Sequence, residues 1–285
     1  MKLKKILATV MATIAAVATF GFAGCGSSKG KDVKVMKDIY LTAEDYAFAI
    51  AKENTTLLEE VNAMLDNWTK DGSLDTLINS YFDGNSDFTY ENKSSSPKDG
   101  DFIMATNAAF PPFEYKKGVY FSGVDVEIAY NIAQELGKTL FVYDMEFDSI
   151  ISSVKTGESD IGMAGMTVNE TRLQQVNFAT PYYSSAQVIT VLESDKTFDN
   201  CTTAAEVEAI LATKGKSYKI GTQNGTTGYM YSKGDEGFGY PGFKNLTTNG
   251  YTTGALAMKD LSNEKIDAVI LDLQPSLLIA ESINR

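Results

Sequence analysis

Strand and helix patterns alternate along this chain in two separate runs, and this alternation constrains the fold more than any other feature. Within residues 102–164, apolar strand patterns are separated by amphipathic helix patterns that end at Gly137 and Gly157. The same order returns within residues 219–285, where Pro275 opens a last helix. Such alternation is typical of mainly parallel sheets with helices on their faces. The sequence therefore predicts an α/β protein with two similar lobes joined by an extended segment. The expected strands are residues 102–106, 140–143, 160–164, 187–192, 219–222 and 266–271, and the expected helices are residues 128–136, 147–157, 253–261 and those that begin at 226 and 275.

The segment before this alternation, residues 33–84, has strand and helix patterns of its own. Residues 85–100 then change character, because they are polar and include a serine run and a proline, which is typical of a linker. Residues 107–118 are expected to form a turn-rich loop. The expected elements of 33–84 are strands at 33–36 and 46–51, a helix that a capping box at 56–59 opens and Gly72 ends, and a second helix capped by Ser73.

Residues 1–24 have the parts of a secretory signal peptide: a lysine-rich start, an apolar run, and small residues before Cys25. Residues 22–25, Phe-Ala-Gly-Cys, resemble the lipobox of bacterial lipoproteins, in which the cysteine is lipidated and becomes the first mature residue. Phe22 departs from that pattern, which usually has Leu there. The alternative is an uncleaved membrane helix, but the apolar run is a little short of the ~20 residues that a span needs. We expect a lipoprotein with residues 25–32 as its tether.

The chain is acidic, with a formal net charge of −12 at pH 7, and the only charged residues that cleavage of the signal peptide would remove are lysines. Such a charge argues against nucleic acid or anionic lipid as a partner. The absence of His excludes Ser-His and Cys-His nucleophile pairs and most zinc sites. After Cys25 only Cys201 remains, so no intramolecular disulfide is expected, and Cys201 is expected to be a small core or surface residue. We expect no cofactor and no metal.

The stretch 158–172 offers several polar groups in a small volume. An expected strand end leads into Gly165 and Thr167, and Asn169 can cap a helical turn that carries Arg172. Free carbonyls and a hydroxyl can accept hydrogen bonds from an ammonium, and a guanidinium fork fits a carboxylate, so the groups suit a zwitterion. The alternative is a strand followed by an ordinary surface helix with a solvated Arg172.

Two glycine-rich stretches could each bind an anion. Gly225-Thr226-Thr227 follows an expected strand and opens a helix, so its backbone N–H groups suit an anion. It is no P-loop, because no lysine follows at the required spacing, and a plain tight turn is the alternative. Residues 237–242 fit the dinucleotide pattern G-x-G-x-x-G, but they follow a charged loop rather than a strand, so we reject a dinucleotide site there.

Three further residues lie where strands end. Asp272 follows the last strand and is either the N-cap of the last helix or a ligand group at the carboxyl edge of a sheet. Phe110 and Phe147 also follow strands, and aromatics at such positions either close the core or flank a ligand side chain.

Several motifs in consistent order resemble those of amino-acid-binding proteins of ABC importers, in the family 3 class of extracytoplasmic solute-binding proteins. The resemblance covers nearly all of residues 33–285 and implies the type II periplasmic binding protein fold, with two α/β lobes joined by hinge strands. The motifs are NAAFPPFEY at 107–115, SGVDVE at 122–127, DIGMAGMTVNETR at 160–172, residues 178–183, QNGTT at 223–227, and DAVILD at 267–272.

The resemblance also implies roles for individual residues. Arg172 would clamp the ligand α-carboxylate, helped by N–H groups at Thr167 and at Thr226 or Thr227. Asp272, the carbonyl of Gly165 and the hydroxyl of Thr167 would take the α-ammonium. The aromatic rings that flank the side chain would be Phe110 and Phe147, and the side-chain selectors would be Asn107 and Gln223.

The order of the segments departs from the family. In the family, the segment like residues 44–82 comes last, whereas here it comes first, so the order resembles a circular permutation. The old C-terminal helices would join the first lobe-1 strand through the linker 85–100. The expected domains are a signal peptide at 1–24, a tether at 25–32, a lobe-2 strand and hinge at 33–45, lobe 1 at 46–184 and lobe 2 at 185–285, with hinge strands near 42–46 and 183–187.

The sequence therefore predicts a monomeric receptor outside the cytoplasm, anchored to the bacterial cell membrane through a lipid on Cys25. It would bind a free amino acid, polar or neutral because Asn107 and Gln223 carry no charge, and deliver it to the permease of an ABC transporter. One alternative is an enzyme on the same fold, like the periplasmic dehydratases of prephenate or arogenate, with Glu114 as the one nearby candidate acid. Another is the ligand-sensing domain of a receptor.

Overall fold

The computed structural model describes residues 30–285. The expected signal peptide, the lipidation site Cys25 and most of the tether lie outside the described residues. Among the residues described, no helix has both the length and the apolar character needed to cross a membrane.

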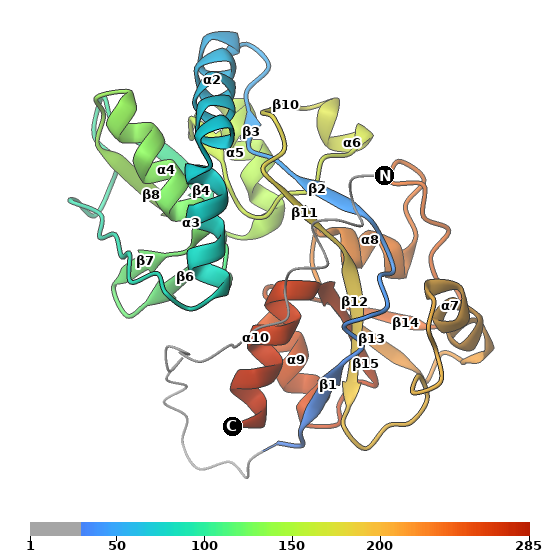
Figure 1. The fold of residues 1–285 in the computed structure, drawn as a ribbon. Coiled ribbons are helices and arrows are strands. Elements are labelled where there is room, and N and C mark those ends of the chain that lie inside the picture. The colour runs from blue at the N-terminus through green and yellow to red at the C-terminus, as the bar shows by residue number, and fades with distance from the viewer. Residues whose placement is uncertain (1–29) are drawn as a thin grey trace.

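Two five-stranded sheets with matching topologies form the centres of two α/β lobes (Figure 1). Each sheet has two neighbouring parallel pairings at one end and two antiparallel pairings at the other. The expected pair of similar α/β lobes is confirmed. The lobe 1 sheet has the order β10 (Asn177–Phe178), β3 (Ala49–Ile50), β9 (Ile161–Gly162), β4 (Phe102–Thr106) and β8 (Leu140–Asp144), and the lobe 2 sheet has the order β1 (Val33–Val35), β12 (Gln187–Leu192), β15 (Ala268–Asp272), β13 (Lys219–Gln223) and β14 (Thr247–Tyr251).

The chain passes between the lobes twice, and the two passages pair with each other. β2 (Glu44–Tyr46) leads from the lobe 2 sheet to the lobe 1 sheet, and β11 (Tyr183–Ser185) leads back. They form an antiparallel ribbon in which Tyr46 lies opposite Tyr183. Figure 1 shows this ribbon between the two lobes, near the expected hinge positions.

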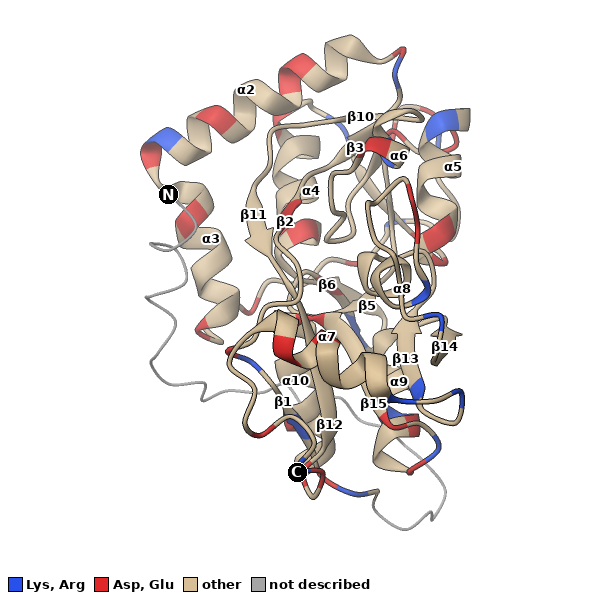
Figure 2. Ribbon diagram, turned by 90° about the vertical axis from the view of Figure 1, so that its right-hand side faces the viewer, with Lys and Arg blue, Asp and Glu red and all other residues tan. Residues whose placement is uncertain are grey.

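Helices cover the sheets of both lobes. Figure 2 shows acidic residues along the outer helices α2 and α3. The helices of lobe 1 are α2 (Thr55–Asp71), α3 (Ser73–Phe82), α4 (Val124–Glu135), α5 (Ile150–Thr156), which follows a 3₁₀ turn at Phe147–Ser149, and α6 (Glu170–Leu173), and those of lobe 2 are α7 (Ala204–Thr213), α8 (Thr227–Lys233), α9 (Gly254–Ser262) and α10 (Leu273–Asn284).

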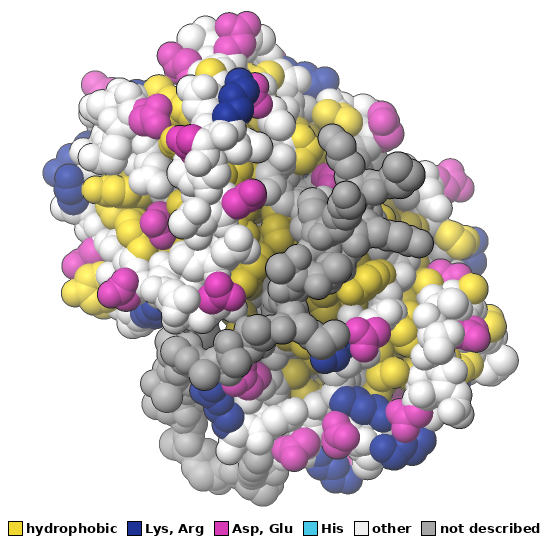
Figure 3. All heavy atoms as spheres, in the orientation of Figure 1, with side chains coloured by type: hydrophobic (Ala, Val, Ile, Leu, Met, Phe, Trp, Pro, Cys, Tyr) yellow, Lys and Arg dark blue, Asp and Glu magenta, His cyan; other side chains and the backbone are white. Residues whose placement is uncertain are grey.

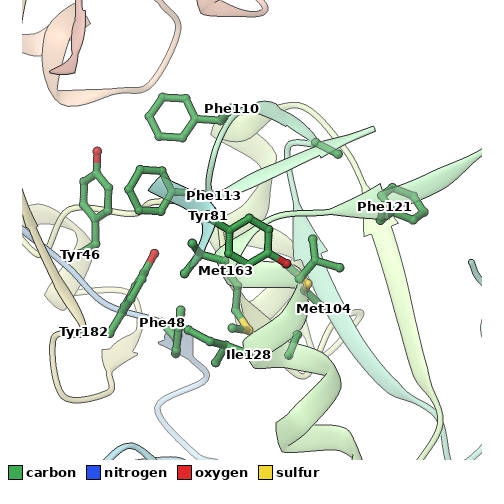
Figure 4. Packing of buried hydrophobic residues seen from close by; sticks show 14 of the residues in the cluster. Tyr46, Phe48, Tyr81, Met104, Phe110, Phe113, Phe121, Ile128, Met163 and Tyr182 are labelled. Carbon is green, nitrogen blue, oxygen red and sulfur yellow. The ribbon is translucent and has the colours of Figure 1, made fainter. Parts of the chain in front are cut away.

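The lobe 1 core is rich in aromatic side chains (Figure 4), and one of them, Phe110, lines the cavity between the lobes. Tyr46 packs edge-on against Phe113 with ring centroids 5.2 Å apart, and Phe48 stacks on Tyr182 at 4.5 Å. These side chains come from both the 44–50 segment and the 102–184 segment, so the early segment is an integral part of the lobe. On the face that Figure 3 shows, acidic side chains are spread over both lobes.

The structure corrects three expectations for residues 44–82. The expected strand at 46–51 is two short strands, β2 and β3, because the chain bends between the ribbon and the lobe 1 sheet. The N-cap of α2 is Asn54, whose side chain accepts a hydrogen bond from the Leu57 N–H at 3.3 Å, so the capping box expected at 56–59 is wrong. Gly72, not Ser73, is the N-cap of α3, since it also ends α2 in the left-handed conformation at φ 81°.

Two segments expected to be a loop and a linker have more structure than the sequence indicated. The loop expected at 107–118 includes β5 (Ala109–Phe110) and β6 (Glu114–Lys117), which form a small sheet with β7 (Tyr120–Ser122). The linker 85–100 is packed onto lobe 1, because the Tyr90 side chain is buried and the Asn92 side chain forms hydrogen bonds with both the N–H and the carbonyl of Val142.

Candidate functional site

One cavity between the lobes is lined by every residue that the sequence predicted for ligand binding. The free space inside it is only about 10 Å³, roughly the room of one water molecule, so the two lobes are closed on each other around it. The lining residues are Asn107, Phe110, Phe147, Gly165, Thr167, Arg172, Gln223, Thr226, Thr227 and Asp272, together with Glu114 and Ala164, which were not in the predicted set.

The topology of the sheets explains why residues so distant in sequence meet here. Gln223 and Asp272 are the last residues of the neighbouring parallel strands β13 and β15, and Asn107 directly follows β4. The carboxyl ends of parallel strands lie at one edge of a sheet, and in α/β proteins ligands bind at that edge. Both lobes present such an edge to the cavity.

Arg172 is held in the cavity by its backbone and by its side chain. The Asn169 side chain caps α6 by accepting a hydrogen bond from the Arg172 N–H at 2.9 Å, as expected. The guanidinium donates through Nη1 to the Thr167 carbonyl at 2.6 Å and through Nη2 to the Gly225 carbonyl of lobe 2 at 2.9 Å. Burial lowers the pKa of Arg172 to about 10, and the nearby charges of Glu44 and Asp272 oppose this shift. The alternative of a solvated surface arginine is therefore wrong.

Asp272 points into the cleft and does not cap the last helix. It occupies the N-cap position of α10 but makes no side-chain hydrogen bond there. Its carboxyl oxygen Oδ1 instead accepts a hydrogen bond from the Tyr46 hydroxyl. Burial, followed by the negative charge of Glu44, raises the pKa of Asp272 to about 7.

Thr167 connects the site to the ribbon between the lobes. Its hydroxyl donates to Glu44 Oε2 at 2.5 Å and receives a hydrogen bond from the Thr227 hydroxyl of lobe 2 at 3.1 Å. Glu44 Oε1 also accepts from the Gln187 side chain at 3.0 Å. The chain of contacts thus runs from Thr227 of lobe 2 through Thr167 to the lobe 2 ends of both interlobe passages.

Asn107 and Gln223 face each other across the cavity. Gln223 Nε2 donates to Asn107 Oδ1 at 2.9 Å, and Asn107 Nδ2 donates to the Met145 carbonyl at 2.7 Å. Both side chains are buried and neutral, so this part of the cavity presents amide groups rather than charges.

Gly165 lies where a side chain would not fit. Its φ is +51°, and a Cβ there would lie 2.7 Å from the Phe110 ring. Its N–H donates to Asp125 Oδ2 at 2.9 Å, and Asp125 Oδ1 accepts from the Tyr182 hydroxyl at 2.5 Å. Burial raises the pKa of Asp125 to about 7. The Gly165 N–H is thus occupied, and Gly165 itself lines the cavity next to the Phe110 ring.

The stretch 225–227 forms the tight turn that begins α8. Thr226 is the N-cap, with its hydroxyl donating to the Gln223 carbonyl at 2.8 Å and accepting from the Tyr229 N–H at 3.4 Å. Within residues 30–285, no group of His, Cys, Asp and Glu side chains is arranged to hold a metal ion.

The model of the bacterial extracellular solute-binding proteins, family 3, matches residues 102–274 of this chain. The chain belongs to this family. The arginine-binding extracellular protein ArtP of Bacillus subtilis is 30% identical over 181 residues, which cover 64% of each chain. The putative ABC transporter arginine-binding protein 2 of Escherichia coli is 32% identical over 172 residues, 59% of this chain and 62% of the relative. This solute-binding protein therefore spans about 64% of the length of the curated relatives that it matches.

Solved structures of amino-acid-binding proteins share its fold. An ancestral arginine-binding protein bound to arginine has a TM-score of 0.54 and 26% identity, and the match covers 65% of this chain and 76% of that one. The ancestral amino-acid-binding protein AncCDT-1, a precursor of cyclohexadienyl dehydratase, has a TM-score of 0.55 and 26% identity, with 64% and 74% covered. The type II periplasmic binding protein fold is thereby confirmed.

Two residues beside this site, Glu44 and Phe238, were missed at the level of sequence, and Glu114 was expected only as the acid of an alternative enzyme. Glu44 lies in a three-residue strand without any motif, and only the pairing of β2 with β11 brings it to Thr167. Glu114 is in the PPFEY motif but is fully buried beside the cavity, where burial and the nearby Asp125 hold its pKa well above the usual value. Phe238 lies in the rejected glycine-rich loop, and its ring lies 5.6 Å from the guanidinium carbon of Arg172.

Proposed function

We propose that this solute-binding protein is an extracytoplasmic receptor that closes on a free amino acid and delivers it to the permease of an ABC transporter. The observation that carries the proposal is the presence of Arg172 from lobe 1 and Asp272 from lobe 2 in one buried cavity. A guanidinium and a carboxylate that approach from opposite lobes match the two charges of a zwitterion. Thr167 and the Gly165 backbone add an acceptor for the ammonium, and Phe110 and Phe147 flank the remaining space.

The proposed ligand has a neutral or polar side chain. The amide pair Asn107 and Gln223 offers donors and acceptors but no charge to balance a cationic or anionic side chain. Some curated relatives are named as arginine-binding or histidine-binding proteins, so the affinities for arginine and histidine should be compared with those for neutral amino acids. A thermal-shift screen of all common amino acids, followed by calorimetry on those that stabilise the protein, tests this proposal. An absence of binding by every L-amino acid at millimolar concentration would reject it.

A second candidate function is catalysis by Glu114. Its carboxyl lines the cavity beside Asp125, and burial together with the charge of Asp125 holds its pKa well above the usual value. A protonated carboxyl in such a place is a candidate general acid. Incubation with prephenate or arogenate and mass spectrometry of the products separate the two functions, because a receptor returns the compound unchanged.

We also propose that Cys25 carries the lipid anchor and that the protein acts as a monomer. The support is the motif at residues 22–25 and the tether that follows it. Mass spectrometry of the protein purified from membranes tests the anchor, since lipidation at Cys25 leaves a diacylated or triacylated N-terminal cysteine. Cys25→Ser should release the protein from the membrane fraction.

The segment order is proposed to be a circular permutation of the family's order. The family model covers residues 102–274, whereas β1 and β3 precede it and complete the two five-stranded sheets. The Asn284 side chain donates to the Val33 carbonyl at 2.8 Å and accepts from the Val33 N–H at 2.9 Å. The end of α10 and the start of β1 thus lie side by side, as two elements joined by a short loop would. Domain boundaries at residues 46 and 185 are proposed on the same basis.

A further inference from the structure

The glycine-rich loop at 234–242, rejected as a dinucleotide site, reaches from lobe 2 onto lobe 1. Phe238 lies at its tip, half-buried, with its ring centroid 5.6 Å from the guanidinium carbon of Arg172. The Phe147 ring of lobe 1 lies 5.4 Å from the same carbon. Arg172 therefore contacts one aromatic ring from each lobe.

The loop has a fixed shape within lobe 2. Asp235 and Tyr240 exchange two backbone hydrogen bonds, at 2.9 and 3.0 Å, and the Phe238 N–H donates to Asp235 Oδ1 at 3.1 Å. At the base of the loop the backbone strands cross closely, since a Cβ at Gly242 would lie 2.2 Å from the Gly234 nitrogen. Tyr240 anchors the loop by packing edge-on against Tyr231, with ring centroids 5.3 Å apart.

The tip of the loop contacts α6 as closely as backbone can. A Cβ on Gly237 would lie 2.1 Å from the Thr171 hydroxyl oxygen and 3.5 Å from the Thr171 Cβ. A side chain at position 237 would therefore have to displace the Thr171 hydroxyl before Phe238 could lie over Arg172. Because Gly237 and Thr171 belong to different lobes, this contact exists only while the lobes are together.

We propose that the loop 234–242 is a latch that holds the closed form, with Phe238 as a further residue of the binding site that acts through Arg172. The negative face of an aromatic ring attracts a cation, and a buried cation gains more from it than an exposed one. While the lobes are closed, the ring also shields the guanidinium from water. When the lobes separate, the guanidinium loses this cover. The latch concerns the same cleft as the proposed function but does not depend on which ligand binds.

A disulfide across the cleft measures the closed form directly. A Cβ–Cβ distance of about 3.5 Å is within the range that a disulfide spans. In the full chain with Cys25→Ser and Cys201→Ser, the pair Thr171→Cys and Gly237→Cys should therefore cross-link under mild oxidation without any amino acid present. Non-reducing electrophoresis gives the rate. Failure to cross-link, while each cysteine alone reacts with a small maleimide, would overturn the latch.

Substitutions of Phe238 in this background test its part. Phe238→Ala should slow cross-linking about 2- to 30-fold. Phe238→Leu, which keeps an apolar side chain without a ring, should slow it to a similar extent. Phe238→Tyr should cross-link at the parent rate. The matched control is Tyr120→Ala, which removes an exposed aromatic side chain from the β6–β7 hairpin and should change nothing. A parent-like rate for Phe238→Ala or Phe238→Leu would overturn the role of the ring. Because no ligand is used, failure of amino-acid binding would reject the proposed function alone.

Discussion

Gln223 of lobe 2 and Asn107 of lobe 1 form a hydrogen bond of 2.9 Å directly across the cleft. Three further groups bridge the lobes nearby: the Arg172 guanidinium with the Gly225 carbonyl, the Thr227 and Thr167 hydroxyls, and the Phe238 ring with Arg172. Polar groups proposed to bind the ligand thus also bind each other when the lobes are closed.

Arg172→Ala should weaken amino-acid binding by two to three orders of magnitude or more. Removal of one partner of a buried charge pair costs roughly 3–5 kcal/mol, and every 1.4 kcal/mol is about tenfold in affinity. Calorimetry measures the loss, and circular dichroism confirms that the fold is intact. Unchanged affinity in a folded variant would remove Arg172 from the site.

Asp272→Asn should weaken binding while keeping the shape of the side chain, because only the negative charge facing the ligand ammonium is lost. A matched chemical test uses the N-acetyl form of the bound amino acid, which lacks the ammonium and should fail to bind the wild-type protein. The assignment is wrong if the variant binds as tightly as wild type.

The affinity should fall as the pH drops below about 7. The pKa of Asp272 is raised to about 7 by burial and by Glu44, so the carboxyl becomes protonated below that pH. The ligand ammonium needs the ionised form, so affinity should fall by up to about tenfold per pH unit until the pKa of the complex is reached. Calorimetry between pH 5.5 and 8 measures this, and Asp272→Asn should show a flatter profile.

The stability of the ligand-free protein should change in the opposite direction over the same range. The raised pKa values of Asp272 and Asp125 mean that the fold favours their protonated forms. Their contribution is fully present below the unfolded carboxyl pKa, near 4, and is lost as pH rises through about 7. Since the chain has no His, no imidazole titration obscures this window. The melting temperature without ligand should therefore be higher at pH 6 than at pH 8.

Asn107→Asp should shift the preference toward cationic side chains. Its oxygen can still accept from Gln223, but a negative charge enters a cavity wall that is now neutral. We expect at least about a tenfold gain for L-arginine relative to L-glutamine, from a charge pair in a partly buried site. The variant should also lose stability, by about 1–3 kcal/mol, because the Met145 carbonyl loses its donor. Competition calorimetry gives the ratio, and equal ratios in both proteins would place the ligand side chain elsewhere.

The proposed permutation predicts that residues 101–285 alone are unstable and bind nothing. Without α2 and α3, lobe 1 would expose apolar surface that Leu57, Val61 and Leu65 now cover. Residues 33–84 placed behind Arg285 through a short flexible linker should restore folding and binding. Cooperative melting and ligand binding by the fragment would refute the permutation, and a stable dimer of the full chain at low concentration would favour a swapped arrangement.

The sequence predicted the elements that carry strong periodicity and the residues at strand ends. It missed α7, although Thr203 and Glu206 form a capping box that is visible as T-x-x-E. It also missed β14, because this polar edge strand has no alternation of apolar residues. Helix starts at residues 54–59 and 72–73 were misplaced, since several adjacent residues could each serve as a cap.

The predicted lining of the cavity depended on motifs, and the missed residues had none. Glu44 reaches Thr167 only because two chain passages pair as β2 and β11, and Phe238 reaches Arg172 only because the lobes are closed. Both contacts join segments more than 60 residues apart in the chain, so no local pattern records them. Tertiary arrangement, not propensity, decides such positions.

The β1 strand lies at the edge of the lobe 2 sheet, paired with β12 on one side and tied to the end of α10 by Asn284. Any force that arrives from the N-terminal tether therefore acts on lobe 2 first, through the contacts of Lys31 with Ser262 and Glu264, the β1–β12 pairing and the Asn284 amide. Along the chain, lobe 1 is reached through β2, which pairs with β11. A lipid at Cys25 would thus hold lobe 2 at the membrane, and lobe 1 would be the lobe that moves when the cleft opens and closes.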